Sequence, residues 1–174
     1  AERSVSKVIL DLCGGTGAWS RHYRANGYTV ILVDPLADAY PDNIRGRVED
    51  FATDVYIENT TFHINDVVGI LAAPPCTQFS GSGARWWAEK EAKQPELLEE
   101  AMDTVVACMD IVRYYQLLGE LKWWVMENPV GRMRRIIKER RGLELGDFKM
   151  TFQPCDYGDP YTKRTCLWGD FTPP

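Results

Sequence analysis

The chain has 174 residues, 45% of them hydrophobic and 26% charged, and a formal net charge of −5. This composition predicts one soluble globular domain over residues 1–174 and leaves no room for a second one. The acidic balance disfavours a general nucleic-acid-binding protein, because binding through phosphate needs local positive charge. Two histidines and five cysteines without a Cys-x-x-Cys spacing predict neither a metal site nor a disulfide framework. Without a membrane-length apolar run or a signal peptide, we expect a cytoplasmic protein.

The N-terminal part of the sequence predicts a cofactor site. The apolar run Val8–Leu12 predicts a buried strand, and the glycine-rich segment Cys13–Ser20 follows it and opens a helix. Glycines allow a close backbone approach to a ligand, and Thr29–Asp34 predicts a second strand whose terminal acid can bind a ribose. Because Ser20 stands three residues after Gly17, the G-x-G-x-x-G pattern is incomplete. An adenosine-containing cofactor without a pyrophosphate fits better.

A second acid is expected near the adenine of that cofactor. Val48-Glu49-Asp50 could end a strand and place Asp50 there, whereas Asp66 precedes the next apolar run and is the competing candidate. Either acid could instead cap a helix. We favour Asp50.

A proline-stiffened cysteine follows the next predicted strand, Val67–Ala72. Pro74 and Pro75 restrict the backbone, so that Cys76 is held at a fixed place where it can react. The alternative is a buried structural cysteine without chemistry. The small residues Ser80–Ala84 predict a flap that can bend beside the thiol.

The longest helix is predicted from about Pro95 to Gly119, with a proline and acids in its first turn. Its apolar positions recur at helical spacing, so its methionines belong to the core. Strands and helices alternate along the whole chain. This order predicts an α/β fold with a mostly parallel twisted sheet and helices on both faces. The core stripe consists of Leu98, Ala101, Met102, Val105, Met109, Val112 and Tyr115.

A further apolar run, Trp123–Pro129, ends in a carboxylate, an amide and a proline, which are Glu127, Asn128 and Pro129. Because ligands in open α/β sheets bind outside the carboxyl ends of the strands, we expect Glu127 and Cys76 to share a site. The basic segment Gly131–Gly142 follows directly. It could hold nucleic acid phosphates, or it could be a solvated helix face whose Met133, Ile136 and Ile137 are buried.

These segments resemble, in the same order, motifs of the cytosine-C5 DNA methyltransferases, which use S-adenosylmethionine. Asp11–Gly17 resembles the family's cofactor loop, Ala73–Ser80 its nucleophile loop and Glu127-Asn128 its Glu-Asn pair. Tyr157–Thr165 is similar, more loosely, to the family's Tyr-Gly-x-Pro-Gln-x-Arg-x-Arg segment. The resemblance spans about Val8 to Gly169 and implies a Rossmann-like methyltransferase fold.

The chain also departs from the family's pattern. Tyr161 replaces the glutamine of the last motif, Lys163 and Thr165 replace its two arginines, and Pro129 follows the Glu-Asn pair where valine is usual. We expect no target-recognition domain, and the resemblance therefore implies an abbreviated, phage- or prophage-like form that acts in a bacterial or phage-infected cell. The implied cofactor residues are Asp11, Cys13, Gly14, Gly15, Thr16, Gly17, Trp19, Asp34, Pro35, Asp50 and Pro74, and the implied catalytic residues are Cys76, Glu127, Asn128, Lys163 and Arg164.

The resemblance implies methyl transfer to C5 of cytosine in DNA, either in a duplex with the base flipped out or in a single strand. Cys76 would add to C6 while protonated Glu127 acts on N3, and Asn128 would hold the loop. Lys163 or Arg164 would supply positive charge for the thiolate. Two alternative functions stay open: a catalytic subunit that needs a recognition subunit as partner, and an inactive module that only binds S-adenosylmethionine. An RNA or free-nucleotide substrate stays open too.

Overall fold

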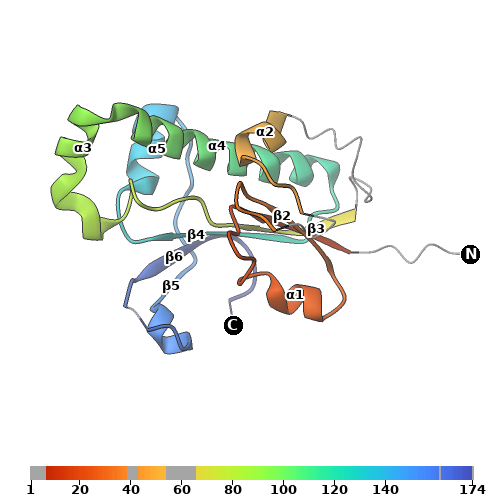
Figure 1. Ribbon diagram of the computed structural model, residues 1–174. Helices are drawn as coiled ribbons and strands as arrows, with labels where there is room; N and C mark the ends of the chain where they lie inside the picture. Colours follow the sequence, from red (N-terminus) through yellow and green to blue (C-terminus); the bar gives the residue numbers. More distant parts are fainter. Residues whose placement is uncertain (1–6, 39–42, 54–65, 161, 174) are drawn as a thin grey trace, which may run out of the picture. The chain divides into compact units, whose positions relative to one another are not determined.

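The computed structural model describes residues 7–38, 43–53, 66–160 and 162–173 (Figure 1). Tyr161, the replacement for the family glutamine, lies outside the described residues. The chain divides into two compact units: the first comes from residues 1–73 and 107–124, the second from residues 74–106 and 125–174. No helix in the described ranges is both long and apolar enough to cross a membrane.

The first unit is built on three parallel strands in the order β2-β1-β3, which are β2 (Thr29–Val33), β1 (Val8–Leu12) and β3 (Val67–Ala72). Their β-branched, almost uninterrupted apolar runs suit strands that are covered on both faces. All five residues of β1 are buried. The three strands predicted from the sequence are therefore confirmed.

Helices cover both faces of these strands. Figure 1 shows α1 (Arg21–Ala25) on one side and α2 (Val48–Thr53) on the other. The strand expected to end at Asp50 is wrong, since Val48 and Phe51 are buried at a helical spacing of three. Acids in the first helical turn also interact favourably with the helix dipole.

One aromatic contact ties α1 to the sheet of the first unit. The Trp123 ring lies against Gly69 of β3 so closely that a Cβ on Gly69 would come within 2.3 Å of it. Tyr23 of α1 stacks on Trp123, with 5.3 Å between ring centroids. A side chain at position 69 would therefore push this aromatic pair off the strand.

The predicted long helix is confirmed as α4 (Pro95–Leu118), and its expected core stripe is buried. Pro95 suits the first helical turn, and Gly119 ends the helix with a φ of +83°. Residues of α4 belong to both units, the second up to Val106 and the first from Ala107.

The second unit continues β4 (Trp123–Pro129), which begins in the first unit beside β3, and adds β6 (Thr165–Asp170) and β5 (Met150–Phe152) in the order β4-β6-β5. Strands β5 and β6 are antiparallel. The helical elements are η2 (Gly81–Trp86), α3 (Trp87–Lys93), α5 (Met133–Arg141) and η3 (Pro154–Tyr157). The predicted flap thus forms the 3-10 helix η2, which runs directly into α3.

Candidate active site

The glycine loop of the first unit follows β1 in a tight turn. Gly14 is in close contact with the protein itself, since a Cβ there would lie 2.4 Å from Oδ1 of Asp11 and 2.2 Å from Leu32. Gly15 has a φ of +58° and nothing within 4 Å of its Cβ position. The loop therefore packs on β1 with one glycine and presents open backbone with the next, as a ligand cradle requires.

Asp34 directly follows β2 and holds this loop. Its Oδ2 accepts a hydrogen bond from the Gly15 N–H at 3.0 Å, and its Oδ1 accepts one from the Leu36 N–H at 2.7 Å. The carboxylate is half-buried. Because both oxygens are fixed and carry further lone pairs, the group is preorganised to accept hydrogen bonds from ligand hydroxyls.

The other residues expected to bind the cofactor are distributed over both units. Thr16 and Pro35 are exposed and Trp19 is half-buried in the first unit. Asp50 lies in the first turn of α2, and Asp66 immediately precedes β3. Pro74 belongs to the second unit, where its carbonyl binds Asn128.

In the second unit, Cys76 begins a hydrogen-bonded turn. Its carbonyl accepts hydrogen bonds from the N–H groups of Phe79 and Ser80, both at 2.9 Å. The turn is joined to the segment after β4, where the Gly81 N–H donates to the Val130 carbonyl at 2.9 Å. Half-buried Cys76 therefore has a fixed backbone and a thiol with some access to solvent.

Glu127 and Asn128 lie near the carboxyl end of β4, as predicted from the apolar run that ends in them. The strand extends to Pro129 because the chain keeps pairing beside β6, and the Val130 N–H still donates to the Arg164 carbonyl at 2.9 Å. Proline can end a strand since it has no N–H to pair. Successive strand residues face opposite sides, which separates the directions of the Glu127 and Asn128 side chains.

Asn128 anchors the cysteine turn from inside the protein. Its side chain is fully buried, and Nδ2 donates to the Pro74 carbonyl at 3.0 Å. Among the described residues Oδ1 has no hydrogen-bond partner. The amide thus connects β4 to the start of the loop that carries Cys76.

Lys163 joins Cys76 and Glu127 into one cluster. Its Nζ lies 3.4 Å from Sγ of Cys76 and donates a hydrogen bond to it. Burial raises the pKa of Glu127, and the charge of Lys163 opposes that rise. The cluster therefore combines a thiol beside an ammonium group with a carboxyl group that keeps its proton to higher pH than usual.

Arg164 does not join this cluster. Its side chain donates from Nε and Nη2 to Oγ1 of Thr151, both at 3.2 Å. Arg164 thus braces β5 against the start of β6, while its neighbour Lys163 contacts the thiol. The looser last motif brings only one of its two expected cations to Cys76.

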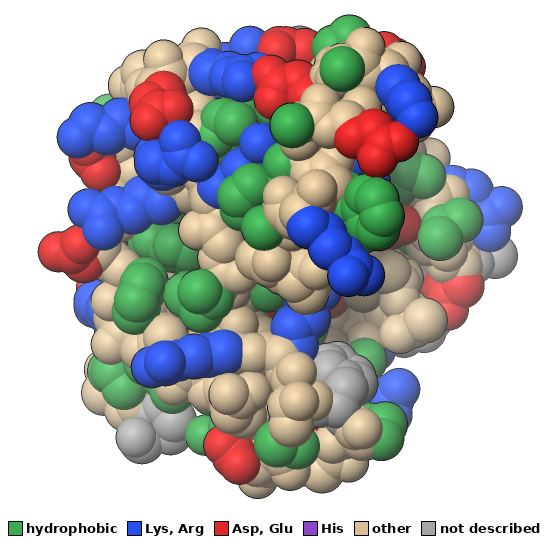
Figure 2. Space-filling model, turned by 90° about the vertical axis from the view of Figure 1, so that its left-hand side faces the viewer, with side chains coloured by type: hydrophobic (Ala, Val, Ile, Leu, Met, Phe, Trp, Pro, Cys, Tyr) green, Lys and Arg blue, Asp and Glu red, His purple; other side chains and the backbone are tan. Residues whose placement is uncertain are grey.

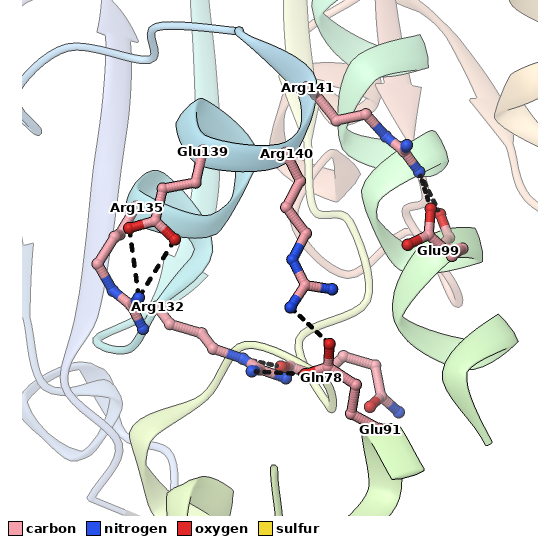
Figure 3. Close-up of polar contacts among 8 residues, drawn as sticks. All are labelled: Gln78, Glu91, Glu99, Arg132, Arg135, Glu139, Arg140 and Arg141. Atoms are coloured by element: carbon pink, nitrogen blue, oxygen red, sulfur yellow. Dashed lines mark hydrogen bonds and ion pairs between the residues drawn. The ribbon is translucent and has the colours of Figure 1, made fainter. Parts of the chain in front are cut away.

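The basic helix α5 is largely paired with acids inside the second unit. On the face of the molecule drawn in Figure 2, Lys and Arg side chains lie beside Asp and Glu side chains. Figure 3 shows several of the ion pairs in close-up. Met133, Ile136 and Ile137 are buried, as the solvated-helix interpretation predicted. Arg132 and Arg140 pair with Glu91, Arg134 and Lys138 with Glu144, Arg135 with Glu139, and Arg141 with Glu99 and Asp103.

Sequence reasoning missed three features near the candidate sites. Asp11 is buried and accepts a hydrogen bond from Ser20 Oγ at 2.5 Å. Cys13 has a φ of 59°, and its side chain together with burial raises the pKa of the Cys108 thiol. Arg132 is buried against the Cys76 turn. An acid inside an apolar strand could have indicated the first feature, but no pattern in the sequence indicates the other two.

Comparisons with known proteins agree with this architecture. No protein-family model matches the chain. The type II methyltransferase M.DdeI of Desulfomicrobium norvegicum is 27% identical to it over 174 residues, an alignment that covers 90% of this chain and 38% of that protein. The chain thus spans well under half the length of this relative.

A solved structure shows the fold. A candidate DNA modification methyltransferase encoded within a prophage of E. coli matches with a TM-score of 0.50 and 20% identity, over 94% of this chain and 46% of the other. A SAM-dependent methyltransferase from Agrobacterium tumefaciens has a TM-score of 0.45 and 18% identity, over 97% and 56%. The chain has a Rossmann-like methyltransferase fold, as predicted.

Proposed function

We propose that the protein transfers a methyl group from S-adenosylmethionine to C5 of cytosine in DNA, through a covalent bond between Cys76 and C6. The observation that carries the proposal is the cluster of Cys76, Lys163 and Glu127, in which an ammonium group lies 3.4 Å from the thiol. Similarity to a type II methyltransferase supports DNA as the substrate.

The first unit fits the cofactor. The open backbone at Gly15 and the fixed carboxylate of Asp34 can hold the ribose of an adenosine compound. Bound S-adenosylmethionine supplies an electrophilic methyl group on a sulfonium sulphur. The chain's own residues then have to make the cytosine ring nucleophilic.

Addition to the ring needs a nucleophile and a proton donor together. Lys163 stabilises the Cys76 thiolate, which bonds to C6, while Glu127 gives its proton to N3 and electron density moves to C5. After C5 takes the methyl group, a base removes the C5 proton and the thiolate leaves, returning the N3 proton to Glu127. Burial of Glu127 favours its protonated form, which this sequence requires.

The chemistry of the cluster favours C5 over an exocyclic amine. An amino nitrogen already has a lone pair and needs no covalent addition to the ring, so a thiol at this place would be idle. C5 of cytosine is unreactive until C6 is attacked. Methylation of an amino group is therefore the competing outcome in the test.

A DNA oligonucleotide containing 5-fluorocytosine tests the proposal. The fluorine prevents the last deprotonation, so methyl transfer should leave a protein–DNA complex that survives denaturation. Cys76→Ala should abolish the complex and keep binding of S-adenosylhomocysteine, whereas Glu127→Gln should slow its formation by about 10²–10⁴-fold. Cys155→Ala, which removes an exposed thiol of the same unit, is the matched control.

Duplex DNA, single-stranded DNA and RNA should be compared in the same assay, with the methylated base identified by mass spectrometry. A product methylated on an amino nitrogen, or C5 methylation by Cys76→Ala, would contradict the proposal. Cofactor binding without reaction on any of these nucleic acids would favour a partner-dependent subunit or an inactive binding module.

A further inference from the structure

Arg132 is a charged side chain in an unusually enclosed place. It precedes α5 directly, and only 7% of it is exposed. Its ion pair with Glu91 is a long one, with 3.9 Å between Nη1 and Oε2. Burying a cation is unfavourable unless specific partners compensate, so this position calls for a role beyond a surface ion pair.

The partners are backbone carbonyls of the Cys76 turn (Figure 3). Nε of Arg132 donates to the Gln78 carbonyl at 2.9 Å, and its backbone N–H donates to the Phe79 carbonyl, also at 2.9 Å. On its other side the same turn closes onto the Cys76 carbonyl. One residue therefore binds two successive carbonyls of the turn that begins at the thiol.

The guanidinium group is itself held in place. It lies over the Trp87 ring of α3, with 4.3 Å between Cζ and the ring centroid. Glu91 of α3 pairs with both Arg132 and Arg140, which joins the beginning and the end of α5 to the same carboxylate. The position of the guanidinium is thus set by two residues of a neighbouring helix.

We propose that Arg132 is a positioning residue for the nucleophile: it fixes the Cys76 turn so that the thiol stays beside Lys163. Arginine suits this role because its planar guanidinium can stack on an indole and donate a hydrogen bond at the same time. Lysine offers a point charge and cannot reproduce both contacts. Arg132 itself bonds to the backbone of the turn, and the described structure gives it no contact with the thiol.

The positioning role of Arg132 can be measured through the reactivity of the Cys76 thiol, which depends on the charged groups around it. Lys163 contacts the thiol, and Glu127 interacts electrostatically with Lys163. If the turn shifts, the thiol leaves the ammonium group and loses the stabilisation of its thiolate. The rate at which Cys76 is alkylated near neutral pH should then fall relative to its rate at high pH, because only the thiolate reacts with an alkylating agent.

The experiment compares alkylation of Cys76 by iodoacetamide near pH 7 and at about pH 9.5, where an ordinary thiol is mostly ionised. Mass spectrometry of the Cys76 peptide gives the rate constant of alkylation at each pH. The rate constant near pH 7 is divided by the one at about pH 9.5. In this ratio, any change in the solvent access of the thiol that affects both rate constants equally cancels. Wild type, Arg132→Met and Arg132→Lys are measured with Arg135→Met as control, since Arg135 is an exposed arginine of the same helix paired with Glu139.

We expect Arg132→Met to lower the ratio severalfold, towards the few hundredths (about 0.03) of an ordinary thiol. Arg132→Lys should lower it less, and Arg135→Met should match wild type. Lys163→Met should also lower the ratio. Adding Arg132→Met to Lys163→Met should have no further effect, because Arg132 acts through the same contact.

Three results would overturn the proposal: an ordinary ratio in wild type, an unchanged ratio in both Arg132 variants, or a further fall in the double variant. Urea unfolding of each variant confirms that the folded protein was alkylated, and Arg132→Lys serves if Arg132→Met does not fold. Alkylation needs neither cofactor nor DNA, so it stays informative if the proposed function fails. If that function holds, Arg132→Lys should lower kcat and leave the KM for DNA unchanged.

Discussion

At the scale of single residues, Asp11 has a property that strand patterns do not reveal. The side chain is fully buried within β1, Ser20 donates to one oxygen, and the other oxygen has no partner among the described residues. Burial is the main cause that raises the pKa of Asp11 to about 6. The folded protein therefore binds this proton more tightly than the unfolded chain does.

Replacing Asp11 by asparagine should change how stability depends on pH. The stabilisation from the tightly held proton is complete below the unfolded pKa of 3.8 and is lost as the pH rises through about 6. Relative to Asp11→Asn, wild type should lose up to about 3 kcal/mol in free energy of unfolding between those limits. Urea unfolding at several pH values measures this, and parallel pH curves would show that the carboxylate ionises without penalty.

The site residues that could be predicted from the sequence were those whose neighbours in the chain set them apart. Cys76 follows two prolines and Asp34 ends an apolar run, and the structure gives each of them specific contacts. Asp50 was misplaced, because a single acid after a short apolar stretch fits a helix start as well as a strand end. Arg132 was hidden in a run of basic residues, where sequence alone cannot distinguish the buried cation from the exposed ones.

At the scale of elements, α5 shows how a basic helix can serve the fold. Exposed ion pairs contribute about 0–1 kcal/mol each, whereas burying an apolar side chain such as Ile136 contributes about 1.5–3 kcal/mol. The apolar side of α5 therefore fixes the helix. Its cations, already paired with acids of the same unit, have less charge to offer to a phosphate chain.

This pairing predicts a weak role for α5 in DNA binding. Arg134→Ala and Arg135→Ala should leave the slope of log K against log salt nearly unchanged for a DNA oligonucleotide, because both arginines keep intramolecular partners. Removing an arginine that neutralises one phosphate would instead reduce the slope by about 0.9. Fluorescence anisotropy at several salt concentrations measures the slope, and a fall of that size for either variant would assign that arginine to phosphate.

At the scale of the whole molecule, each unit carries one candidate site. The glycine loop and Asp34 belong to the first unit, and the Cys76 cluster belongs to the second. Two elements, α4 and β4, have residues in both. Because a helix or strand is stabilised cooperatively along its length, we expect the units to unfold together.

Ligand binding tests this expectation. S-adenosylhomocysteine at about 100 times its Kd should raise the free energy of unfolding by about 2.7 kcal/mol. If unfolding is shared, native-state hydrogen exchange should slow for amides of β6 as well as for those of β1. Protection confined to the first unit would show that the second opens independently.

Alternating apolar runs and turn residues were sufficient to predict the α/β fold, the first three strands and the long helix. The polar end of β4 was predicted as well, although Glu127, Asn128 and Pro129 are poor strand formers that are kept extended by pairing with a distant segment. The contact between Lys163 and Cys76 joins residues 87 positions apart. The spacing of residues along the chain does not show which residues so far apart in sequence come into contact, and only the resemblance pointed to Lys163.

The cysteine turn and the segment after β4 match each other residue by residue, which constrains insertions and deletions. Val130 meets Gly81, Gly131 meets Ser80 and Arg132 meets Phe79, while a Cβ on Gly131 would lie 1.9 Å from the Phe79 carbonyl oxygen. One residue added to either segment would shift every later pair and bring a side chain to the place that only glycine can occupy. The two segments can therefore change length only together.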